Sequence, residues 1–516
     1  MVAILPYREP EPDVAQETPA GTWARLYARS EYVRHRARVN SALTLPEVYP
    51  EEDSSDLMSG QHSYQSLGSR GMNCFVNKVA VALFRPSTSF FRLRPTKKFL
   101  RKYLENNPGE TQRDLDTYLA KQEREAGDAW TQKGEHHKIN MALSHIAIIG
   151  QACLWFDEDM DSLRVVPFSQ YCVARTATGK IDTLIIAEQL SVKDLHGDLQ
   201  TYLLAQPGYQ VGSSVQLYTR ASRQLDGSYV VETGVDDYMA PERFTRKYKE
   251  GDLPFAVPFW KLPDGASYGV SMVDGLQGDL LAYNEISKAL VSGSLALMDW
   301  RLLVNPGGQT NIDDLKRSSP GEAVAGLPGD IGLSLQGDPN VLQYVQTLAL
   351  QLDRRLSSAF LLDQGVFREG ERVTATEIQR VVQSLEEQYS GIYAALAHEF
   401  QAPLARWVLK SSGIKLDNSI QVSIVTGFDA ISRQNDVSNL TQALSVLGQL
   451  QQLPPPLLDR LNWHVIAASV GDGFGIGLEE FLIPEEQYQQ QIQQQQQQQA
   501  ALQVAAQQAT QQPPQE

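Results

Sequence analysis

Hydrophobic residues recur every three or four positions along three stretches in the middle of the chain, which predicts three helices. The first is expected to begin near Ser271 and to end at Asn305-Pro306-Gly307-Gly308, where proline and glycine stop a helix. The second is expected to begin at Asp338-Pro339, because a carboxylate accepts hydrogen bonds from first-turn amides and proline lacks an amide hydrogen. The third opens with Thr374-Ala375-Thr376-Glu377, which has the pattern of a capping box.

Each predicted helix carries one apolar stripe. In chain order, the stripes consist of Leu276, Leu280, Leu281, Ile286, Leu290, Leu297 and Met298; of Leu342, Val345, Ala349, Leu352, Leu356 and Phe360; and of Ile378, Val381, Leu385, Tyr389, Ile392, Leu396, Phe400, Leu404 and Val408. Pro403 lies within the third stripe and is expected to bend that helix, because proline removes a backbone hydrogen bond. We treat residues 268–409 as the part around which the chain is organised.

The residues before this part predict a mixture of helices and strands. Helical patterns cover residues 22–45, 67–84, 114–131 and 135–150. Strand composition, punctuated by turns such as Asp226-Gly227, covers residues 152–156, 163–167, 183–190, 214–219 and 229–233. Together these segments indicate a mostly antiparallel β region packed on helices.

Residues 22–45 are basic on one side of the predicted helix. The basic residues are Arg25, Arg29, Arg34, Arg36 and Arg38. We favour a solvated or subunit-contacting face over a nucleic-acid site, because no aromatic stacking pattern accompanies the arginines.

The two loops between the central helices differ in character. Residues 305–337 are rich in Gly, Pro and Ser and have no helical stripe, which suggests a small module or a functional extension. Residues 361–373 hold alternating charges near glycines that permit motion, in Phe367, Arg368, Glu369, Glu371 and Arg372. By themselves these residues fit either a functional loop or a surface connector with solvated charges.

The chain after residue 409 predicts a short strand at residues 420–426 and helices at 437–451 and 455–470. Residues 487–516 are rich in Gln and Ala. This composition permits either a helix or a disordered polar tail, and we leave both open.

Composition restricts the class of protein. A chain of 516 residues exceeds the size at which a single core usually divides, so several packed regions are expected. Its three cysteines, Cys74, Cys153 and Cys172, suit a reducing compartment and are expected to be plain buried thiols. The sequence has neither a long apolar run nor the apolar core of a signal peptide, so we expect a soluble protein without a membrane partner.

Two motifs resemble phosphate and calcium sites but fail in detail. Gly365 and Gly370 have the spacing of a P-loop, yet Glu371 stands where the loop needs a lysine. The run from Asp157 to Asp161 begins like a calcium loop, yet its sixth position is Ser162 rather than glycine. Nucleotide and calcium binding are therefore not expected, and a solvated hairpin turn is the preferred reading of the acidic run.

The sequence also gives no support for a dinucleotide-binding, metal-binding or catalytic site. The glycine run at residues 471–477 follows a helical pattern instead of a strand, so it reads as a flexible connector. His136 and His137 are adjacent and point to different sides of a helix, and His145 has no evident partner. We find no catalytic residue, no metal site and no cofactor, and expect the protein not to be an enzyme.

Several longer segments resemble the portal, or head-to-tail connector, of short-tailed bacteriophages (podoviruses) of the autographivirus type. The matching segments are Gln65-Ser66-Leu67-Gly68-Ser69-Arg70-Gly71, Leu83-Phe84-Arg85-Pro86, Tyr268-Gly269-Val270-Ser271, Leu303-Val304-Asn305-Pro306-Gly307-Gly308, Gly370-Glu371-Arg372-Val373-Thr374-Ala375-Thr376-Glu377-Ile378 and Gln401-Ala402-Pro403-Leu404. They are spread over most of the chain.

The resemblance implies an α+β, predominantly α-helical portal fold with wing, stem, clip and crown, assembled as a homododecameric ring around a channel for double-stranded DNA. It assigns residues 1–265 to N-terminal helices and a mixed β region of the wing, 266–304 to the first stem helix, 305–338 to the clip, 339–360 to the second stem helix, 361–373 to a channel loop, 374–433 to a long kinked wing helix and strand, 434–486 to the crown, and 487–516 to a Gln-rich tail, either a helical barrel or disordered.

The same resemblance implies two sets of functional residues. Phe367, Arg368, Glu369, Glu371 and Arg372 would line the DNA channel. The clip residues that would meet the packaging motor and the tail are Asn305, Pro306, Gly307, Gly308, Lys316 and Arg317.

The implied function is the portal vertex of a phage capsid, made in the bacterial host cytoplasm and incorporated in the virion. It would nucleate head assembly, admit and retain DNA during motor-driven packaging, attach the tail and release the genome. Its partners would be further copies of the chain, double-stranded DNA, the terminase motor, tail adaptor proteins, and capsid and scaffolding proteins.

Charge is compatible with this role but does not establish it. With 45 basic and 61 acidic residues, the net charge of -16 argues against gripping DNA by general phosphate neutralisation. An acidic wall would let DNA slide, although an ordinary acidic protein has the same balance. Two alternatives are a nucleotide-driven DNA translocase and a helical scaffold or adaptor without a DNA channel.

Overall fold

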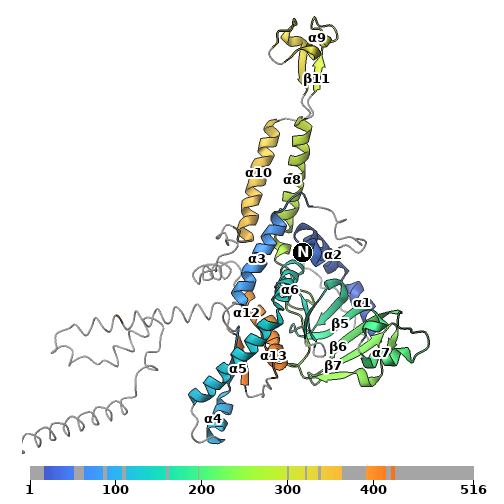
Figure 1. Cartoon of the computed structure of the whole chain (residues 1–516), viewed down its shortest axis with the longest axis vertical. Helices are drawn as coiled ribbons and strands as arrows, with labels where there is room; N and C mark the ends of the chain where they lie inside the picture. Colours follow the sequence, from blue (N-terminus) through green and yellow to red (C-terminus); the bar gives the residue numbers. More distant parts are fainter. Residues whose placement is uncertain are drawn as a thin grey trace, which may run out of the picture. The chain divides into compact units, whose positions relative to one another are not determined.

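The computed structural model describes residues 17–50, 63–84, 90–106, 112–157, 162–195, 197–298, 301–319, 322–334, 339–362, 391–413 and 420–424, and Ser445. The chain divides into two units, Met1–Gly427 and Phe428–Glu516. All elements discussed below belong to the first unit, in which helices and sheets are mixed (Figure 1).

The α-helices are α1 (Pro19–Arg29), α2 (Glu31–Leu43), α3 (Leu67–Leu83), α4 (Lys97–Asn106), α5 (Gln112–Lys133), α6 (His136–Ile149), α7 (Gly197–Leu204), α8 (Gln277–Met298), α9 (Ile312–Arg317), α10 (Pro339–Ala359), α12 (Ile392–Leu396) and α13 (Ala402–Ser411). The strands are β1 (Phe91–Pro95), β2 (Cys153–Asp157), β3 (Ser162–Val166), β4 (Tyr171–Arg175), β5 (Ile181–Ser191), β6 (Ser214–Arg223), β7 (Tyr229–Val235), β8 (Tyr238–Met239), β9 (Arg246–Tyr248), β10 (Phe255–Ala256), β11 (Arg301–Val304), β12 (Ile331–Ser334) and β13 (Ile420–Ile424).

The largest sheet is antiparallel, as the strand patterns predicted. Its strands follow the order β4-β5-β6-β7-β8, and β9 also pairs with β7. The predicted turn at Asp226-Gly227 joins β6 to β7, with Gly227 in the left-handed region at φ 83°. The predicted strands at residues 183–190, 214–219 and 229–233 are confirmed as β5, β6 and β7.

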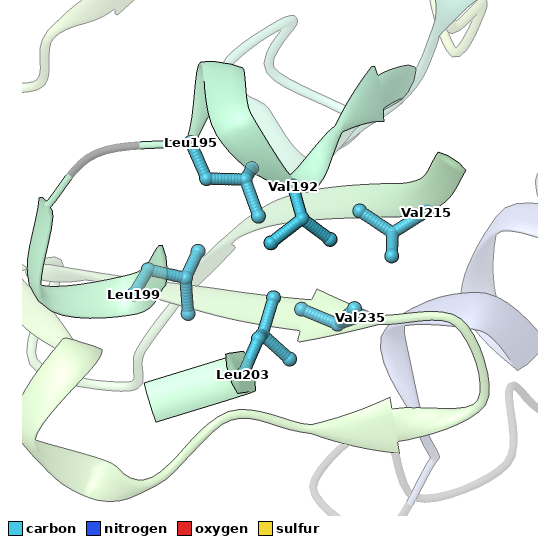
Figure 2. Close-up of a cluster of buried hydrophobic side chains, with 6 residues drawn as sticks. All are labelled: Val192, Leu195, Leu199, Leu203, Val215 and Val235. Atoms are coloured by element: carbon cyan, nitrogen blue, oxygen red, sulfur yellow. The ribbon is translucent and has the colours of Figure 1, made fainter. Parts of the chain in front are cut away.

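Helices pack on both faces of this sheet. On one face, Leu26 of α1 joins Cys172, Ala174 and Ile185 in a buried cluster. On the other face lie α7 and the segment before it, as Figure 2 shows. The side chains of this second cluster are Val192, Leu195, Leu199, Leu203, Val215 and Val235. Alternate residues of each strand point to opposite faces, so both sides of the sheet bury apolar side chains.

A smaller antiparallel sheet has the order β10-β2-β3. Asp157 at the end of β2 pairs with Ser162 at the start of β3. The acidic run between them therefore connects two paired strands, which confirms the hairpin reading; residues 158–161 themselves lie outside the described residues.

The predicted helices at residues 67–84, 114–131 and 135–150 are confirmed as α3, α5 and α6. α3 packs against α6 and α10, and α2 packs against α6 and α8. The predicted strand at residues 420–426 is confirmed as β13, and its antiparallel partner, β1, was not predicted. In the part of the chain that the structure describes, no helix combines the length and hydropathy needed to cross a membrane.

The basic segment at residues 22–45 differs from its prediction in two ways. It forms two helices that meet at Ser30. The prediction of a solvated or subunit-contacting face is wrong for Arg34, which is buried and donates to the carbonyl oxygens of Phe168 and Tyr171. Arg36 likewise donates to the carbonyl oxygen of Gly269. These arginines bind the N-terminal helices to the rest of the fold.

The first central helix is shorter than predicted. α8 ends at Met298, and Arg301–Val304 form β11, which pairs with β12 instead of continuing the helix. The second helix, α10, begins at Pro339 as predicted, and its predicted stripe is buried at Ala349, Leu352 and Leu356.

The third central helix is interrupted where its stripe predicted continuity. Gly391 has φ 91°, a left-handed conformation that breaks an α-helix, and α12 begins only after it. A π-helical turn, Ala397–Gln401, then precedes α13. Pro403 lies in the first turn of α13, so the irregularity expected from this proline falls on the turn before it.

Several predicted features fall outside the described residues. They are the P-loop-like glycines Gly365 and Gly370, the capping box at residues 374–377, the helices at 437–451 and 455–470, the glycine run at 471–477 and the Gln-rich segment 487–516.

His145 of α6 is buried, and among the described residues its Nδ1 has no hydrogen-bond partner. Burial lowers the pKa of His145 to about 4, from 6.5 in an unfolded chain. Because the unfolded state then binds more protons than the folded state, the contribution to stability is complete above pH 6.5 and is lost as the pH falls towards 4.

We therefore expect His145→Gln to flatten the pH dependence of stability between pH 6.5 and 4, by about 3 kcal/mol over this window. Urea denaturation at a series of pH values would measure the difference between the two proteins. Parallel curves for the variant and the wild type would contradict a neutral, buried imidazole.

Candidate functional site

α8 and α10 form an antiparallel hairpin whose contacts run along its length (Figure 1). At one end, Arg355 pairs with Asp279 at 2.9 Å between Nη2 and Oδ2. Tyr283 donates its hydroxyl to Asp353, and burial together with that carboxylate raises the pKa of Tyr283. Further along, Gly293 lets the helices approach closely, since a Cβ there would lie 3.3 Å from Cδ1 of Leu342.

The half of the hairpin that carries the loop between its helices has an unusual surface. Residues 289–298 and 339–352 include no charged residue. Even so, their apolar side chains are widely exposed in the single chain: Val291 by 51%, Leu295 by 62%, Met298 by 76%, Val341 by 58% and Tyr344 by 73%. Large apolar side chains that stay exposed together on a helix pair are typical of a site of contact with another molecule, and we interpret this surface in that way.

The loop between the two helices folds as a small module, as its length suggested. β11 pairs with β12, and the amide of Asn305 donates to the carbonyl oxygen of Asp330 at 2.9 Å. The buried carboxylate of Asp330 accepts three hydrogen bonds at Oδ2, from the amides of Gln309 and Thr310 and from the Thr310 hydroxyl. Gly308 leaves room for this carboxylate, because a Cβ there would lie 2.4 Å from Cγ of Asp330.

The predicted clip residues all belong to this module. Asn305 accepts from the amide of Gly307 in a tight turn that also contains Pro306. Lys316 and Arg317 lie exposed in the last turn of α9, where the helix dipole favours positive charge. Asn311 caps the start of α9 by accepting from the amide of Asp313.

Asp330 was not among the residues predicted from the sequence. The signal that could have identified it is an aspartate directly after the turn residues Pro328 and Gly329.

We expect Asp330→Ala to loosen the module, because three donors lose their buried acceptor. Hydrogen exchange of residues 305–330 should become at least about tenfold faster, while exchange in α8 and α10 stays unchanged. Asp313→Ala, at an exposed position of the same module, is the matched control. Unchanged protection in Asp330→Ala would contradict the proposed role of this carboxylate.

Comparison with protein families decides the classification. The model of the family described as bacteriophage head to tail connecting protein matches residues 16–482. The chain belongs to this family. The hairpin, the loop module and the four sheets of the described residues all lie within the matched residues.

Individual relatives agree with the family. The connector is 28% identical to the portal protein of Enterobacteria phage SP6 over 474 residues, which are 91% of this chain and 90% of that protein. It is 27% identical to the portal protein of Escherichia phage T7 over 493 residues, covering 92% and 90%. Among solved structures, a chain from the virion of a native gene transfer agent particle is 13% identical with a TM-score of 0.34, covering 80% of this chain and 90% of that chain.

The predicted channel-loop residues Phe367, Arg368, Glu369, Glu371 and Arg372 lie outside the described part of the connector. Residues of α3 hold the C-terminal end of α10, which precedes this loop. Lys78 of α3, whose pKa is lowered by burial, donates from Nζ to the carbonyl oxygen of Leu361 at 2.5 Å. Phe360 packs on Gly71, where a Cβ would lie 2.5 Å from its ring. Sequence reasoning missed this role of α3.

The segment that follows residue 390 is also held by α3. The side-chain amide of buried Gln401 donates to the carbonyl oxygen of Leu83 at the end of α3. α3 therefore holds both described flanks of residues 363–390.

Within the described ranges, no group of three or more His, Cys, Asp or Glu side chains is placed to hold a metal ion. The three cysteines are free thiols; Cys153 and Cys172 are buried, as predicted, and Cys74 is half-buried. Burial raises the pKa of the Cys153 and Cys172 thiols, which keeps them protonated and unreactive.

Two clefts in the β region are lined by ion pairs. One, of about 840 Å³, contains Arg164 paired with Glu188, and the other, of about 780 Å³, contains Lys180 paired with Glu250.

Proposed function

We propose that this connector forms the portal vertex of a phage capsid, as a homododecameric ring around a channel for double-stranded DNA. Such a ring would nucleate head assembly, admit DNA driven by the packaging motor, retain it, and release it through the tail. The observation that carries the proposal is the uncharged, apolar surface of the α8–α10 hairpin in a chain of this family. The relatives named portal protein support the same role.

The uncharged apolar surface of the hairpin favours contact with further copies of this chain. A chain with net charge -16 repels its own copies, so an uncharged contact surface removes that repulsion where copies would approach. Covering the exposed valine, leucine, methionine and tyrosine side chains would supply the free energy of association. Copies arranged around an axis leave an opening along it, which is the property that a DNA channel requires.

We assign the other parts by the same reasoning. The loop module would form the clip, where Lys316 and Arg317 present positive charge to the terminase motor and later to tail adaptor proteins. The residues of the 361–373 loop would line the channel. The protein would act as a structural component of the virion, made in the host cytoplasm, and the motor would supply the ATP hydrolysis.

Electron microscopy of the purified protein tests the proposal. We expect closed rings with an axial hole and no ATP turnover in the presence or absence of DNA. A discrete monomer at high protein concentration would contradict the ring. ATP turnover that persists through repeated purification would favour a translocase, and particles without a central hole would favour a scaffold or adaptor.

We further expect Arg368 and Arg372 to act as a weak, repeated contact with DNA. Replacing both by alanine should lower the packaged-genome yield per particle at least about threefold, because symmetry multiplies each lost phosphate contact. Ring assembly should be unchanged, since we assign subunit contact to the hairpin. Lysine at both positions keeps the charge and should restore packaging. Loss of rings in the alanine variant would place these arginines at a subunit interface.

A further inference from the structure

A short stretch of β1 and α4 is strongly basic in an otherwise acidic chain. Residues 91–102 contain no aspartate or glutamate, whereas the chain as a whole has a net charge of -16. The basic residues of this stretch are Arg92, Arg94, Lys97, Lys98, Arg101 and Lys102. Half of its positions therefore carry positive charge, with no acidic residue between them.

The two arginines of β1 lie on one face of its two-stranded sheet. The residues beside them, Phe91 and Leu93, are buried at 0% and 5% exposure. Because successive strand residues point to opposite faces, Arg92 and Arg94 lie on the other face, where both are exposed. Their partners across the sheet in β13 are an uncharged serine and an uncharged glutamine. This face of the sheet is therefore positively charged.

The basic residues of α4 also share one side. Lys98, Arg101 and Lys102 are three and four positions apart, which places them on one face of the helix, and all three are exposed. The first turn of α4 holds no acidic residue, so the positive end of the helix dipole adds to their charge. Only three residues separate Arg94 from Lys98, which keeps the strand group and the helix group within about 14 Å of each other.

These exposed side chains form what we call the basic surface: Arg92, Arg94, Lys98, Arg101 and Lys102. Among the described residues, the only member of this set with an ion pair is Arg101, which lies 3.4 Å from Glu105. The two side chains of that pair are 85% and 66% exposed, so the pair contributes little. Glu123 lies close to β1, but its Oε1 accepts from the amide of Leu93 at 2.6 Å. The positive charge of the basic surface is thus largely uncompensated.

We propose that the basic surface binds the phosphate backbone of double-stranded DNA, at a site separate from the loop assigned to the channel. Duplex DNA carries one negative charge per about 1.7 Å of its axis, and exposed lysines and arginines neutralise it without reading its sequence. Salt screens the acidic residues elsewhere in the chain beyond about 8 Å, so the net charge does not prevent a local contact. The inference rests on the proposed function only for the source of the DNA, which is the packaged genome.

The surroundings of the basic surface favour duplex DNA over other polyanions. The large apolar side chains that the structure describes in residues 91–106 are all buried or half-buried. The surface therefore lacks the apolar centre of a stable protein interface. A single strand would need exposed aromatic rings on which its bases stack. The aromatic residues of α4, Phe99 and Tyr103, are half-buried and contact each other with ring centroids 5.9 Å apart.

Fluorescence anisotropy with a labelled duplex of mixed sequence tests the proposal. The variant carries Lys98→Gln, Arg101→Gln and Lys102→Gln, substitutions that keep good helix formers in α4. We expect it to bind the duplex at least about tenfold more weakly than the wild type at about 0.1 M salt. The slope of log K against log salt concentration should also fall, by about 2.7 for each copy that the duplex touches, since each phosphate contact contributes about 0.9.

Two controls separate the basic surface from charge in general. Lys193→Gln, Lys247→Gln and Lys249→Gln together remove the same charge at exposed positions of the β region, and this variant should bind within about twofold of the wild type. Exchange of lysine and arginine at positions 98, 101 and 102 keeps the charge and should preserve binding. Circular dichroism and electron microscopy would compare the folding and the rings of all variants with the wild type.

Four results would overturn the inference. Wild-type binding by the α4 glutamine variant would show that the basic surface does not hold DNA. An equal loss in the β-region control would assign binding to net charge. Loss of rings in the α4 variant would place the basic surface at a subunit contact. Polyglutamate that displaces the labelled duplex better than unlabelled duplex does would indicate an acidic protein as the partner.

The proposed function has a separate readout. Failure of the wild type to form rings would overturn the portal ring. The binding curves could still be compared in that case, because the basic surface belongs to a single chain.

Discussion

Replacing Arg34 by methionine is expected to lower the free energy of unfolding by about 4 kcal/mol. Arg34 is 2% exposed, and its guanidinium lies at the junction of α2 with the β region. It donates to the Ser30 hydroxyl at 2.8 Å and to the carbonyl oxygens of Phe168 and Tyr171 at 2.7 and 2.9 Å. It also stacks on Tyr27, 4.1 Å from the ring centroid. Methionine fills much of the same volume but cannot donate to either buried carbonyl oxygen.

Urea denaturation followed by circular dichroism would measure this loss. Arg29→Met is the matched control, because Arg29 is exposed in the last turn of α1 and its replacement should change stability by less than about 0.5 kcal/mol. Equal effects of the two substitutions would mean that the buried hydrogen bonds of Arg34 contribute little.

Replacing Gly150 by alanine is expected to destabilise the fold by at least about 3 kcal/mol. Gly150 ends α6 at φ 104°, a conformation that side chains with a Cβ rarely adopt. An added Cβ would also lie 2.5 Å from the carbonyl oxygen of Gly269, and backbone cannot move aside as a flexible side chain can. The conformational strain and the steric overlap with Gly269 should therefore both lower the free energy of unfolding.

Gly134→Ala separates these two contributions. Gly134 has φ 67°, but an added Cβ would meet nothing within 4 Å among the described residues. Its replacement should cost about 1 kcal/mol, the conformational part alone. Thermal denaturation of the two variants side by side measures the difference, and similar melting temperatures would show that the segment around Gly269 shifts to accept the methyl group.

Local signals in the sequence predicted much of the fold. Helix α10 begins at Pro339, where the capping pattern placed it, and the Asp226-Gly227 turn joins two paired strands. Helices α3, α5 and α6 also lie where their apolar periodicity indicated. Such features depend on interactions between residues a few positions apart, which a single sequence displays directly.

Features that depend on distant parts of the chain were not predictable in this way. The arginines of residues 22–45 had the spacing of a basic helix face, but the sequence does not show that the carbonyl oxygens of Phe168 and Tyr171 would meet Arg34. In the same way, Asp330 became the centre of the loop module because folding brings Gln309 and Thr310 to its carboxylate. A buried polar group is identified by its partners, and partners are set by the tertiary structure.

The central helices show most clearly which features follow from the sequence and which follow from the tertiary structure. The sequence by itself predicted apolar helices near residues 271–304 and 339–360, and the resemblance of its segments to portals indicated the family. Only the tertiary structure decided that α8 ends at Met298 and that Val291 and Tyr344 remain exposed in the single chain. The physical reason is that periodicity reports which side chains avoid water, whereas packing decides whether the same chain covers them or leaves them to a neighbour.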